Sequence, residues 1–447
     1  MHSSLRLGGG AGFAGDRLEA PVLLAEHGAL DYLVLECLAE RTIALAQLRR
    51  RRDPNAGFDA RLDERIESLL PVLARKRVRL VSNLGAANPE GAAARIAAIA
   101  RRMCIPVKVA AVTGDDVLDA LDLDAPALES GLPLSKYGPV VSANAYLGAE
   151  AILPALASGA DIVITGRVAD PSLFVAPLMH EYGWAADDVD RLARGTAVGH
   201  LLECAGQLCG GYFADPGRKN VPNMAALGFP FADVDTDGNA TLGKVVGTGG
   251  RLTVATATEQ LLYEVTDPHG YLTPDVTADF SGVTLTEAES DCVAVRGARG
   301  RQRPDRLKVS VGYRAGFVGE GEIGYAGDNA VARAELATQI LRERLHGRFA
   351  ELRFDLIGST SLHGRSFDSG AHPYEVRLRV AARAATHEEA AIVGDEVEAL
   401  YTNGPAGGGG TRKSVTEQIG IVSTLIDRSR VSIHVTLHEG NAHAQAV

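Results

Sequence analysis

The segment TGRVADPS, residues 165–172, places Arg167, Asp170 and Ser172 directly after the apolar run DIVI. A guanidinium in such a loop can hold a carboxylate or a thioester oxygen through charge-assisted hydrogen bonds. We predict that Arg167 and Asp170 are catalytic and that Ser172 contacts the substrate. The alternative for Asp170 is a helix N-cap, because Pro171 follows it where the first turn of a helix tolerates proline.

A second group of reactive side chains lies in ECLAER, residues 36–41, after the apolar run DYLVL. Glu36 and Glu40 are one helical turn apart, and two carboxylates held close together can separate their pKa values into an acid and a base. We predict that Glu36 is catalytic and that Cys37 contacts the substrate. At a helix start the pKa of Cys37 would be lowered and the thiol would act as a nucleophile; core packing is the alternative.

The helical segment GTAVGHLLECAGQL, residues 195–208, carries His200, Glu203 and Cys204 at positions i, i+3 and i+4. This spacing puts the three side chains on one face of the helix. We predict that His200 is a general acid or base and that Glu203 orients it. A metal ion is the alternative, which we do not favour because the spacing matches no metal-binding signature.

Gly10, Gly12 and Gly15 form the pattern G-x-G-x-x-G after the apolar run at the start of the chain. This spacing is typical of the turn that brings backbone against the pyrophosphate of a dinucleotide. Asp16 follows immediately, and its carboxylate would repel a pyrophosphate from the same N–H groups. We predict that Asp16 and Arg17 contact a substrate, and we keep a nicotinamide cofactor as the alternative.

Two further patterns suggest ligand contacts. Asn83, Asn88 and Asn144 follow apolar runs and can orient a substrate oxygen, although asparagine is also an ordinary turn residue. In NGPAGGGGTRK, residues 403–413, four consecutive glycines precede two cations, and this run can cradle phosphates. The predicted phosphate-binding residues are Gly407, Gly408, Gly409, Gly410, Arg412 and Lys413. A flexible lid or a plain turn is the alternative.

The elements that must position these residues alternate between short apolar runs and alanine-rich helical segments up to about residue 184. The runs include DYLVLE, VRLVSN, VKVAAV and DIVITG, and the helical segments include EGAAARIAAIARRM. This alternation predicts an α/β fold whose parallel sheet has helices on both faces. Later segments such as RLKVSVGYR and YEVRLRVAA predict a mixed α+β region. We divide the chain into residues 1–210 and 211–447, with the boundary between 210 and 250.

In an open parallel sheet, ligands bind beyond the carboxyl ends of the strands. The polar loops that carry Asp16, Glu36, Asn83 and Arg167 each follow a predicted strand of the first region. We therefore predict that these loops converge on one cleft.

Composition limits the partners of the chain. Acidic residues outnumber basic ones by 56 to 45 over 447 residues, so the formal net charge is −11. A surface of this sign repels nucleic acid and anionic membranes, which leaves a small molecule as the expected ligand. The five scattered cysteines are typical of reduced thiols, and no apolar window has the length of a membrane span. We expect a cytoplasmic protein.

Several long segments in order resemble the acyclic terpene utilisation family AtuA, from about Leu5 to Gly410. They are GGGAGFAGDR, DYLVLECLAERTIALAQ, SNLGAANP, ITGRVADPSL, GHLLECAGQLCGGYFADPG and NGPAGGGG. The resemblance implies a place beside acyl-CoA enzymes in the catabolism of acyclic terpenes such as citronellol and geraniol, and it does not imply a nicotinamide cofactor. Longer members carry an extra C-terminal domain that this chain is expected to lack, so a homo-oligomer or a small partner subunit is an expected arrangement.

Our leading hypothesis is a catabolic enzyme that performs acid–base chemistry, as a hydratase or lyase, on a carboxylate or an acyl-CoA thioester. In this hypothesis Asp170 or Glu36 moves the proton, Arg167 holds a carboxylate or polarises a carbonyl, and His200 with Glu203 forms a second acid–base pair. Coenzyme A enters as part of the substrate, and the other cofactors are unknown. The alternatives are an NAD(P)-dependent oxidoreductase and a non-catalytic subunit or ligand-binding protein.

Overall fold

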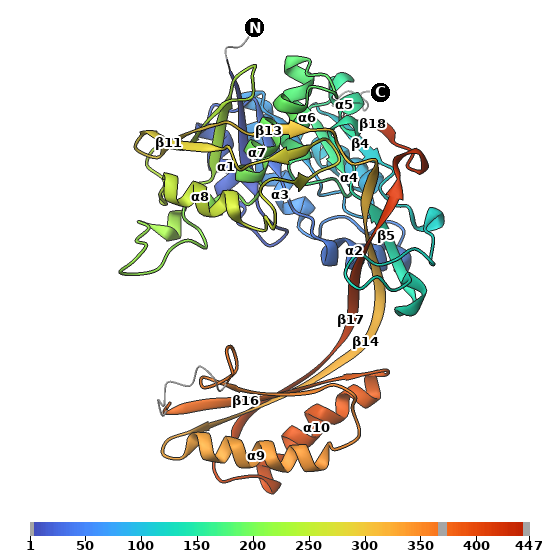
Figure 1. Ribbon diagram of the computed structural model, residues 1–447, viewed down its shortest axis with the longest axis vertical. Coiled ribbons are helices and arrows are strands. Elements are labelled where there is room, and N and C mark those ends of the chain that lie inside the picture. Colours follow the sequence, from blue (N-terminus) through green and yellow to red (C-terminus); the bar gives the residue numbers. More distant parts are fainter. Residues whose placement is uncertain (1–3, 365–372, 441–447) are drawn as a thin grey trace. The chain divides into compact units, whose positions relative to one another are not determined.

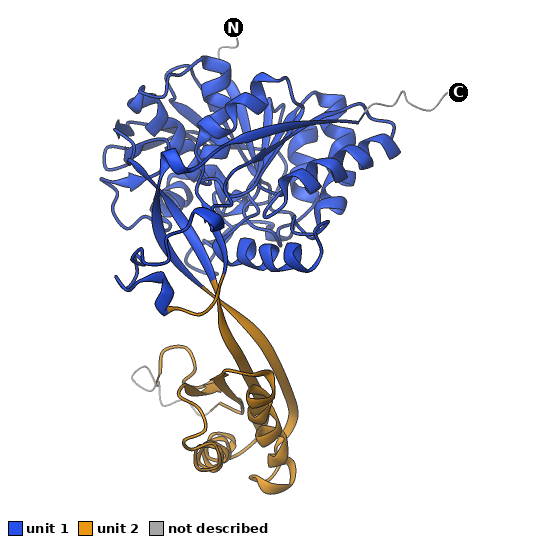
Figure 2. Cartoon of the chain, turned by 90° about the vertical axis from the view of Figure 1, so that its right-hand side faces the viewer, with its two compact units in different colours: residues 1–136, 141–312, 421–447 blue, residues 137–140, 313–420 orange. Residues whose placement is uncertain are grey.

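The structure is a computed structural model, and it describes residues 4–364 and 373–440 (Figure 1). The chain forms two compact units, coloured separately in Figure 2. Unit 1 comprises residues 1–136, 141–312 and 421–447, and unit 2 comprises residues 137–140 and 313–420. Unit 1 therefore contains every predicted site residue except the glycine run at 407–410 and the two cations that follow it.

Unit 1 is built on a ten-stranded mixed sheet whose five central strands are parallel. In spatial order these are β1 (Leu5–Ala11), β2 (Tyr32–Leu35), β3 (Arg79–Ser82), β6 (Ile162–Thr165) and β4 (Lys108–Thr113). Five antiparallel strands extend the sheet at its two edges: β7 (Pro230–Val234), β8 (Ala240–Lys244), β12 (Cys292–Arg296) and β11 (Thr284–Glu289) beyond β1, and β18 (His434–Glu439) beyond β4. The predicted α/β class with parallel strands is confirmed.

Alternate side chains of the parallel strands enter two separate cores, one on each face of the sheet. On β2, Tyr32 and Val34 join the core beneath one set of helices, whereas Leu33 and Leu35 join the other. The first core includes residues of α5 (Leu153–Ala157), α6 (Ser172–Tyr182) and α7 (Val189–Glu203). The second includes residues of α1 (Glu19–His27), α3 (Leu62–Lys76) and α4 (Pro89–Arg102). Strands buried on both faces explain the continuously apolar runs.

The two units do not follow the predicted division between residues 210 and 250. Strands β7, β8, β12 and β11 follow β1 in succession in the ten-stranded sheet, so these four strands of residues 230–296 extend the first sheet. The other elements of this part of the chain are α8 (Val254–Leu262) and a small sheet of β9 (Tyr271–Leu272), β10 (Thr277–Asp279) and β13 (Arg299–Arg301). Strand β5 (Val140–Ala145) comes earlier in the chain and lies outside the ten-stranded sheet. The pairs that attach the added strands, β1 with β7 and β8 with β12, join residues far apart in sequence and leave no signal in local sequence.

Unit 2 contains two helices on one side of four strands of a five-stranded sheet, and Figure 1 shows both helices on the same side of β16. Its elements are β14 (Arg306–Ala326), α9 (Ala330–Arg344), β15 (Leu352–Ile357), β16 (Glu375–Ala384), α10 (His387–Asn403) and β17 (Gly409–Asp427). The order β-α-β-β-α-β with the sheet order β15-β16-β14-β17 is that of ferredoxin-like units. The chain leaves unit 1 within β14 and returns to it within β17.

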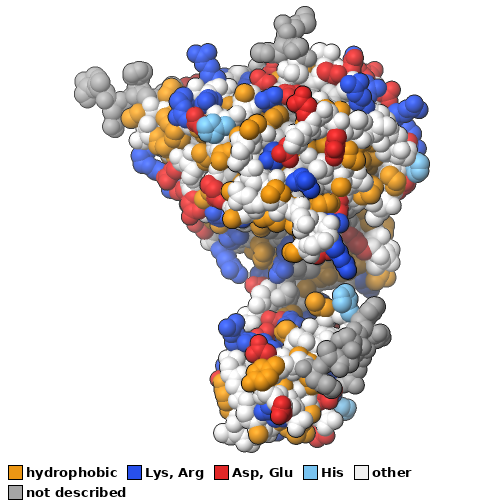
Figure 3. Space-filling view, turned by 90° about the vertical axis from the view of Figure 1, so that its left-hand side faces the viewer, with side chains coloured by type: hydrophobic (Ala, Val, Ile, Leu, Met, Phe, Trp, Pro, Cys, Tyr) orange, Lys and Arg blue, Asp and Glu red, His pale blue; other side chains and the backbone are white. Residues whose placement is uncertain are grey.

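Charged side chains of both signs are interspersed over the molecular face in Figure 3. Within residues 4–364 and 373–440, no helix has the length and hydropathy that a membrane span requires.

Candidate functional site

The loops after β2, β3 and β6 are tied together by hydrogen bonds at the carboxyl ends of the strands. Nδ2 of Asn83 donates to Oε1 of Glu36 at 2.9 Å, and Oδ1 of Asn83 accepts from the backbone N–H of Cys37 at 2.7 Å. The guanidinium of Arg167 donates from Nη1 to the carbonyl oxygen of Leu38. The structure therefore brings Glu36, Asn83 and Arg167 from three separate loops into one network.

Glu36 and Glu40 have opposite pKa shifts, although the predicted helical spacing between them is wrong. Glu36 lies in the loop after β2, and Glu40 is the first residue of α2 (Glu40–Arg52). Burial raises the pKa of Glu36 to about 7, against the opposing effects of Arg167 and two hydrogen bonds. Burial also acts to raise the pKa of Glu40, but the hydrogen bond from Tyr146 and the nearby cations lower it to about 2. Different environments therefore separate the pKa values of the two carboxyl groups.

Arg167 is buried and holds Asp170. Its side chain is 1% exposed, and it donates from Nε to the carbonyl of Val168 at 2.8 Å and from Nη2 to Oδ1 of Asp170. Together with the bond to Leu38, all three guanidinium nitrogens are engaged by the protein. Arg167 therefore positions Asp170. Its guanidinium nitrogens bind protein atoms and not a substrate, contrary to the predicted role.

Asp170 does not cap the following helix. Helix α6 begins at Ser172 after an N-cap at Pro171, and no side chain supplies a cap hydrogen bond there. The Asp170 carboxylate accepts from Arg167 instead, and its side chain remains 36% exposed. A carboxylate that is fixed on one side and exposed on the other is suited to accept a proton or bind a hydroxyl group.

Asp170 lines a pocket of about 560 Å³ in unit 1. The other polar side chains of the pocket include Glu40, Tyr146, Tyr271 and Lys308, and its apolar lining includes Leu128, Ala169, Pro171, Leu272, Leu307 and Leu425. Nζ of Lys308 lies 3.4 Å from Oε1 of Glu40 and 4.8 Å from the centre of the Tyr146 ring. Cζ of Arg167 lies 4.6 Å from the same ring centre.

The sequence analysis missed Tyr146, Tyr271 and Lys308. Tyr146 lies in the segment NAYLGAE, of which the sequence analysis named only Asn144. The tyrosine two residues after Asn144 is a signal from which it could have been predicted. Tyr271 and Lys308 come from segments more distant in sequence, where no motif marks them. Asp115, after β4, was also missed: burial raises its pKa to about 6, and its Oδ2 accepts from the backbone N–H of Arg167 at 2.9 Å.

His200 and Glu203 form a buried pair on α7. Nδ1 of His200 lies 2.8 Å from Oε1 of Glu203, and Nε2 lies 3.3 Å from the carbonyl oxygen of Leu261. Burial acts to lower the pKa of His200, but the neighbouring Glu203 carboxylate raises it overall. Both ring nitrogens are engaged, so the structure reverses the predicted arrangement: the histidine orients the glutamate. Oε2 of Glu203 has no hydrogen-bond partner among the described residues.

The predicted nucleophilic role of Cys37 is wrong. Its side chain is buried, and α2 begins only at Glu40, so Cys37 does not lie at a helix start. Burial raises the pKa of its thiol well above the ordinary value, against the effect of Arg65. At neutral pH this cysteine is a protonated core residue.

Three predicted substrate contacts have structural partners. The hydroxyl of Ser172 donates to the buried Asp275, and Nδ2 of Asn144 donates to Oδ2 of Asp115 at 2.8 Å. Asn88 caps α4: its Oδ1 accepts from the N–H of Gly91 at 3.0 Å, and its Nδ2 donates to two backbone carbonyls. Asn144 reaches the network through Asp115, whereas Ser172 and Asn88 lie outside it.

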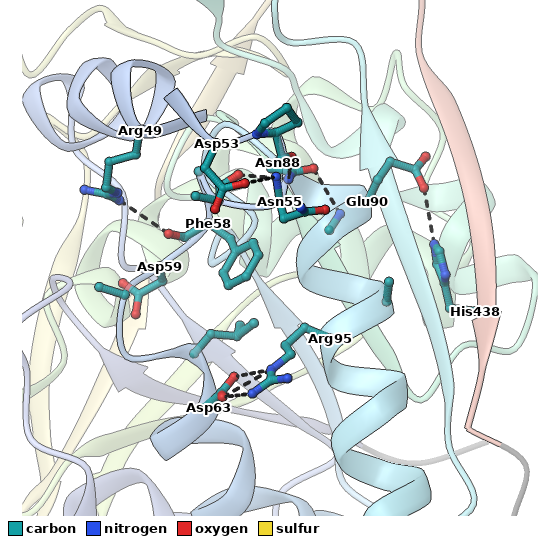
Figure 4. Close-up of a pocket in the computed structure, with 17 residues that line it drawn as sticks. Arg49, Asp53, Asn55, Phe58, Asp59, Asp63, Asn88, Glu90, Arg95 and His438 are labelled. Atoms are coloured by element: carbon teal, nitrogen blue, oxygen red, sulfur yellow. Dashed lines mark hydrogen bonds and ion pairs between the residues drawn. The ribbon is translucent and has the colours of Figure 1, made fainter. Parts of the chain in front are cut away.

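Asn88 lines a different pocket of about 930 Å³, between α2, α3 and α4, which Figure 4 shows in close-up. Its charged groups are largely engaged with one another. Nε of Arg95 donates to Asp63 at 2.9 Å, and Nε2 of His438 lies 3.2 Å from Oε2 of Glu90 (Figure 4). We therefore place the candidate site in the pocket lined by Asp170.

The N-terminal glycines provide close packing. A Cβ on Gly12 would lie 2.8 Å from the carbonyl carbon of Cys204, and one on Gly9 would lie 2.4 Å from the carbonyl oxygen of Leu202. The N–H of Gly12 already donates to Oδ2 of Asp16 at 3.0 Å. The glycines let β1 approach the end of α7, and Asp16 occupies an N–H group that a pyrophosphate would need.

Arg17 lies away from the pocket. Its Nη1 donates to the carbonyl oxygen of Ala225 at 2.9 Å, and its Nε lies 4.0 Å from Oε1 of Glu19. Both Arg17 and Glu19 are exposed.

The glycine run of unit 2 leads into β17. Gly407 and Gly410 have φ values of +70° and +65°, which glycine adopts without strain. Nζ of Lys413 lies 2.9 Å from Asp395 and 2.6 Å from Glu398 on α10. Because neighbouring residues of a strand point to opposite faces, Arg412 faces away from α10, so Lys413 does not share a face with Arg412 as the predicted group of two cations requires.

Within the described ranges, 4–364 and 373–440, no three His, Cys, Asp or Glu side chains are grouped so that they could hold a metal ion.

A comparison with protein families shows which family the chain belongs to. The model of the acyclic terpene utilisation family protein AtuA matches residues 5–437. The chain belongs to the AtuA family. No curated protein and no solved structure matched it. The AtuA match includes the segments of both units, among them the loops that carry Glu36, Asn83 and Arg167 and the glycine run before β17.

Proposed function

We propose that this AtuA-family protein is a catabolic enzyme that performs acid–base chemistry, as a hydratase or lyase, on a carboxylate or acyl-CoA intermediate of acyclic terpene degradation. The observation that supports the proposal best is the pocket of about 560 Å³ that combines an apolar lining with fixed carboxylates and a lysine. Family membership supports the role in terpene utilisation.

The apolar part of the pocket suits a branched hydrocarbon chain. Leu128, Leu272, Leu307 and Leu425 supply most of the large aliphatic surface. Removing such a chain from water favours binding by about 25 cal/mol per Å² of buried apolar area. A pocket of this size accommodates an acyl chain with its carbonyl group, and the remainder of a thioester would extend outside it.

The polar part of the pocket supplies a base and a cation. Asp170, held in place by Arg167, removes a proton next to the carbonyl group or activates a water molecule. Lys308 binds the carboxylate or carbonyl oxygen of the substrate. Glu36, whose pKa of about 7 allows it to exchange a proton near neutral pH, supports the loop network behind Asp170 through Arg167.

We further propose that the enzyme acts in the cytoplasm, alone or as a homo-oligomer. The glycine run from Gly407 to Gly410, with Arg412 beside it, remains the proposed contact for phosphate groups of a coenzyme A thioester.

Calorimetric titration with isoprenoid acids, their coenzyme A thioesters and NAD(H), followed by assays for hydration, dehydration and cleavage, tests the proposal. We expect binding of the acids or thioesters, turnover by the wild type, and binding without turnover in Asp170→Asn. Binding of NAD(H) alone would overturn the proposal in favour of an oxidoreductase. Binding of acyl compounds without wild-type turnover would make the chain a ligand-binding protein.

A further inference from the structure

Glu40 is a second carboxylate of the pocket that Asp170 lines. It is the first residue of α2, and its side chain is 40% exposed. Oε1 of Glu40 accepts a hydrogen bond from the hydroxyl group of Tyr146 and lies 3.4 Å from Nζ of Lys308. The pocket therefore contains two carboxylates, and each of them is paired with a cation of the protein.

The two partners of Glu40 are fixed by contacts with each other and with Arg167. The backbone N–H of Tyr146 donates to the carbonyl oxygen of Lys308 at 2.9 Å, which connects the end of β5 to β14. Cζ of Arg167 and Nζ of Lys308 lie 4.6 Å and 4.8 Å from the centre of the Tyr146 ring. Because both donors have fixed positions, Oε1 of Glu40 has a fixed position as well.

The carboxylate of Glu40 has acceptor positions left for a ligand. An ionised carboxylate accepts about four hydrogen bonds, and Tyr146 and Lys308 both contact the same oxygen. Burial acts to raise the pKa of Glu40, but the hydrogen bond from Tyr146 and the nearby cations lower it to about 2. Glu40 is therefore an ionised acceptor at neutral pH, and its exposed part lies in the lining of the pocket.

The surroundings of the two carboxylates indicate which donor the ligand supplies. An ammonium group gains most from a negative charge without a partner, but Glu40 and Asp170 are both paired with a cation already. A neutral hydroxyl group needs only an acceptor at a fixed position. The apolar lining favours a hydrocarbon chain over a polyol, and its large residues are Leu128, Leu272, Leu307 and Leu425.

We propose that Glu40 is a specificity residue that accepts a hydrogen bond from a hydroxyl group on the acyl chain of the ligand, and that Tyr146 and Lys308 position it. The inference rests on the proposed function and names its substrate class, a hydroxyacyl compound. When water adds to a double bond conjugated with a carbonyl group, the proton adds to C2 and the hydroxyl group to C3. Glu40 binds this C3 hydroxyl group. The ammonium group of Lys308 has three N–H donors, so it holds Glu40 and also binds an oxygen of the substrate.

Calorimetric titration with a matched pair of acids tests the role of Glu40. The probes are 3-hydroxy-3,7-dimethyloctanoic acid and 3,7-dimethyloctanoic acid, which differ only in the C3 hydroxyl group. We expect the wild type to bind the hydroxylated acid about 10-fold more tightly, because a hydrogen bond to a charged group is among the stronger ones. Glu40→Ala should bind the two acids with similar affinity. Tyr146→Phe, which removes a donor that fixes Glu40, should reduce the preference.

Glu259→Ala is the matched control. Oε2 of Glu259 lies 2.6 Å from Nζ of Lys219 outside the pocket, and its side chain is exposed to a similar extent. This variant should keep the full preference for the hydroxylated acid. Glu40→Gln retains the size of the side chain and serves if Glu40→Ala fails to fold. It should reduce the preference, because its acceptor oxygen has lost the negative charge.

Equal affinities of the wild type for the two acids overturn the inference even where the enzyme turns over an acyl substrate. An unchanged preference in a folded Glu40→Ala variant, or in Glu40→Gln where it serves instead, also overturns it, as does the failure of both acids to bind. Absence of turnover in the wild type contradicts the proposed function, whereas the difference between the two affinities still decides whether Glu40 binds a hydroxyl group.

Discussion

Nη2 of Arg167 donates a hydrogen bond to Oδ1 of Asp170, and the two side chains differ sharply in exposure, at 1% for the arginine and 36% for the aspartate. The positive charge is buried among backbone carbonyls, and the negative charge faces the pocket. Such a pair holds a carboxylate in a fixed orientation at a surface that a ligand can reach.

Asp170→Asn should lower turnover about 100-fold and the free energy of unfolding by less than about 1 kcal/mol, because the amide oxygen still accepts from Arg167 while the base is lost. Kinetics and urea denaturation measure the two effects. Asp237→Asn removes an exposed carboxylate that pairs with Arg191 at 2.9 Å, and turnover should be unaffected in that control. Equal losses of activity in both variants would count against a specific role for Asp170.

Glu36→Gln should change how stability depends on pH. The pKa of Glu36 rises from 4.5 to about 7 on folding because the carboxyl group is buried. Between about pH 4.5 and 7 the folded protein retains a proton that the unfolded chain releases, so the wild type loses stability as pH rises. Relative to Glu36→Gln, this loss should reach about 3 kcal/mol at pH 7 and above. Denaturation at several pH values measures it.

Glu40→Gln should show the opposite sign. Despite burial, which acts to raise it, the pKa of Glu40 is lowered to about 2 by Tyr146 and nearby cations. The wild type should therefore lose stability relative to Glu40→Gln as pH falls from about 4.5 toward 2. Parallel curves for the wild type and both variants would contradict these assignments.

Lys308→Met should weaken the binding of an acidic ligand about 10-fold and reduce the dependence of binding on salt. The matched control is Lys219→Met. Nζ of Lys219 lies 2.6 Å from Glu259 and 4.5 Å from the centre of the Phe213 ring, so it has the same kinds of neighbours as Lys308 outside the pocket. Titrations at two salt concentrations compare the variants, and an equal affinity in Lys308→Met would remove the lysine from the site.

Gly12→Ala should destabilise unit 1 by about 2 to 3 kcal/mol, because its Cβ would lie 2.8 Å from the carbonyl carbon of Cys204. Gly270→Ala is the control, since the nearest atom there is a side-chain oxygen of Asp267 at 3.3 Å. A folded Gly12→Ala variant of wild-type stability that has lost an affinity for NAD(H) would restore the dinucleotide hypothesis.

Lys413→Gln should leave the stability almost unchanged, because Lys413 and its partners Asp395 and Glu398 are exposed. It should leave the affinity for a coenzyme A thioester unchanged, whereas Arg412→Gln should reduce that affinity. Equal affinities in the wild type and both variants would remove phosphate binding from the glycine run.

The sequence by itself determined the α/β class and the position of much of the network. Apolar runs such as VRLVSN need burial on both faces, and polar residues directly after such runs, Glu36, Asn83 and Arg167, lie at the carboxyl ends of parallel strands. The burial of these runs and the position of these polar residues follow from the local residue pattern and from the strand direction. A few consecutive residues determine both.

The tertiary structure alone decided which of these side chains face a ligand. Burial turned Arg167 into a positioning residue, raised the pKa of Cys37, and raised the pKa of Glu36. Tyr271 and Lys308 line the pocket beside Asp170 although they are about 100 or more residues away from it in the sequence. Solvation and electrostatic interactions depend on distances in space, and a local pattern contains no measure of those distances.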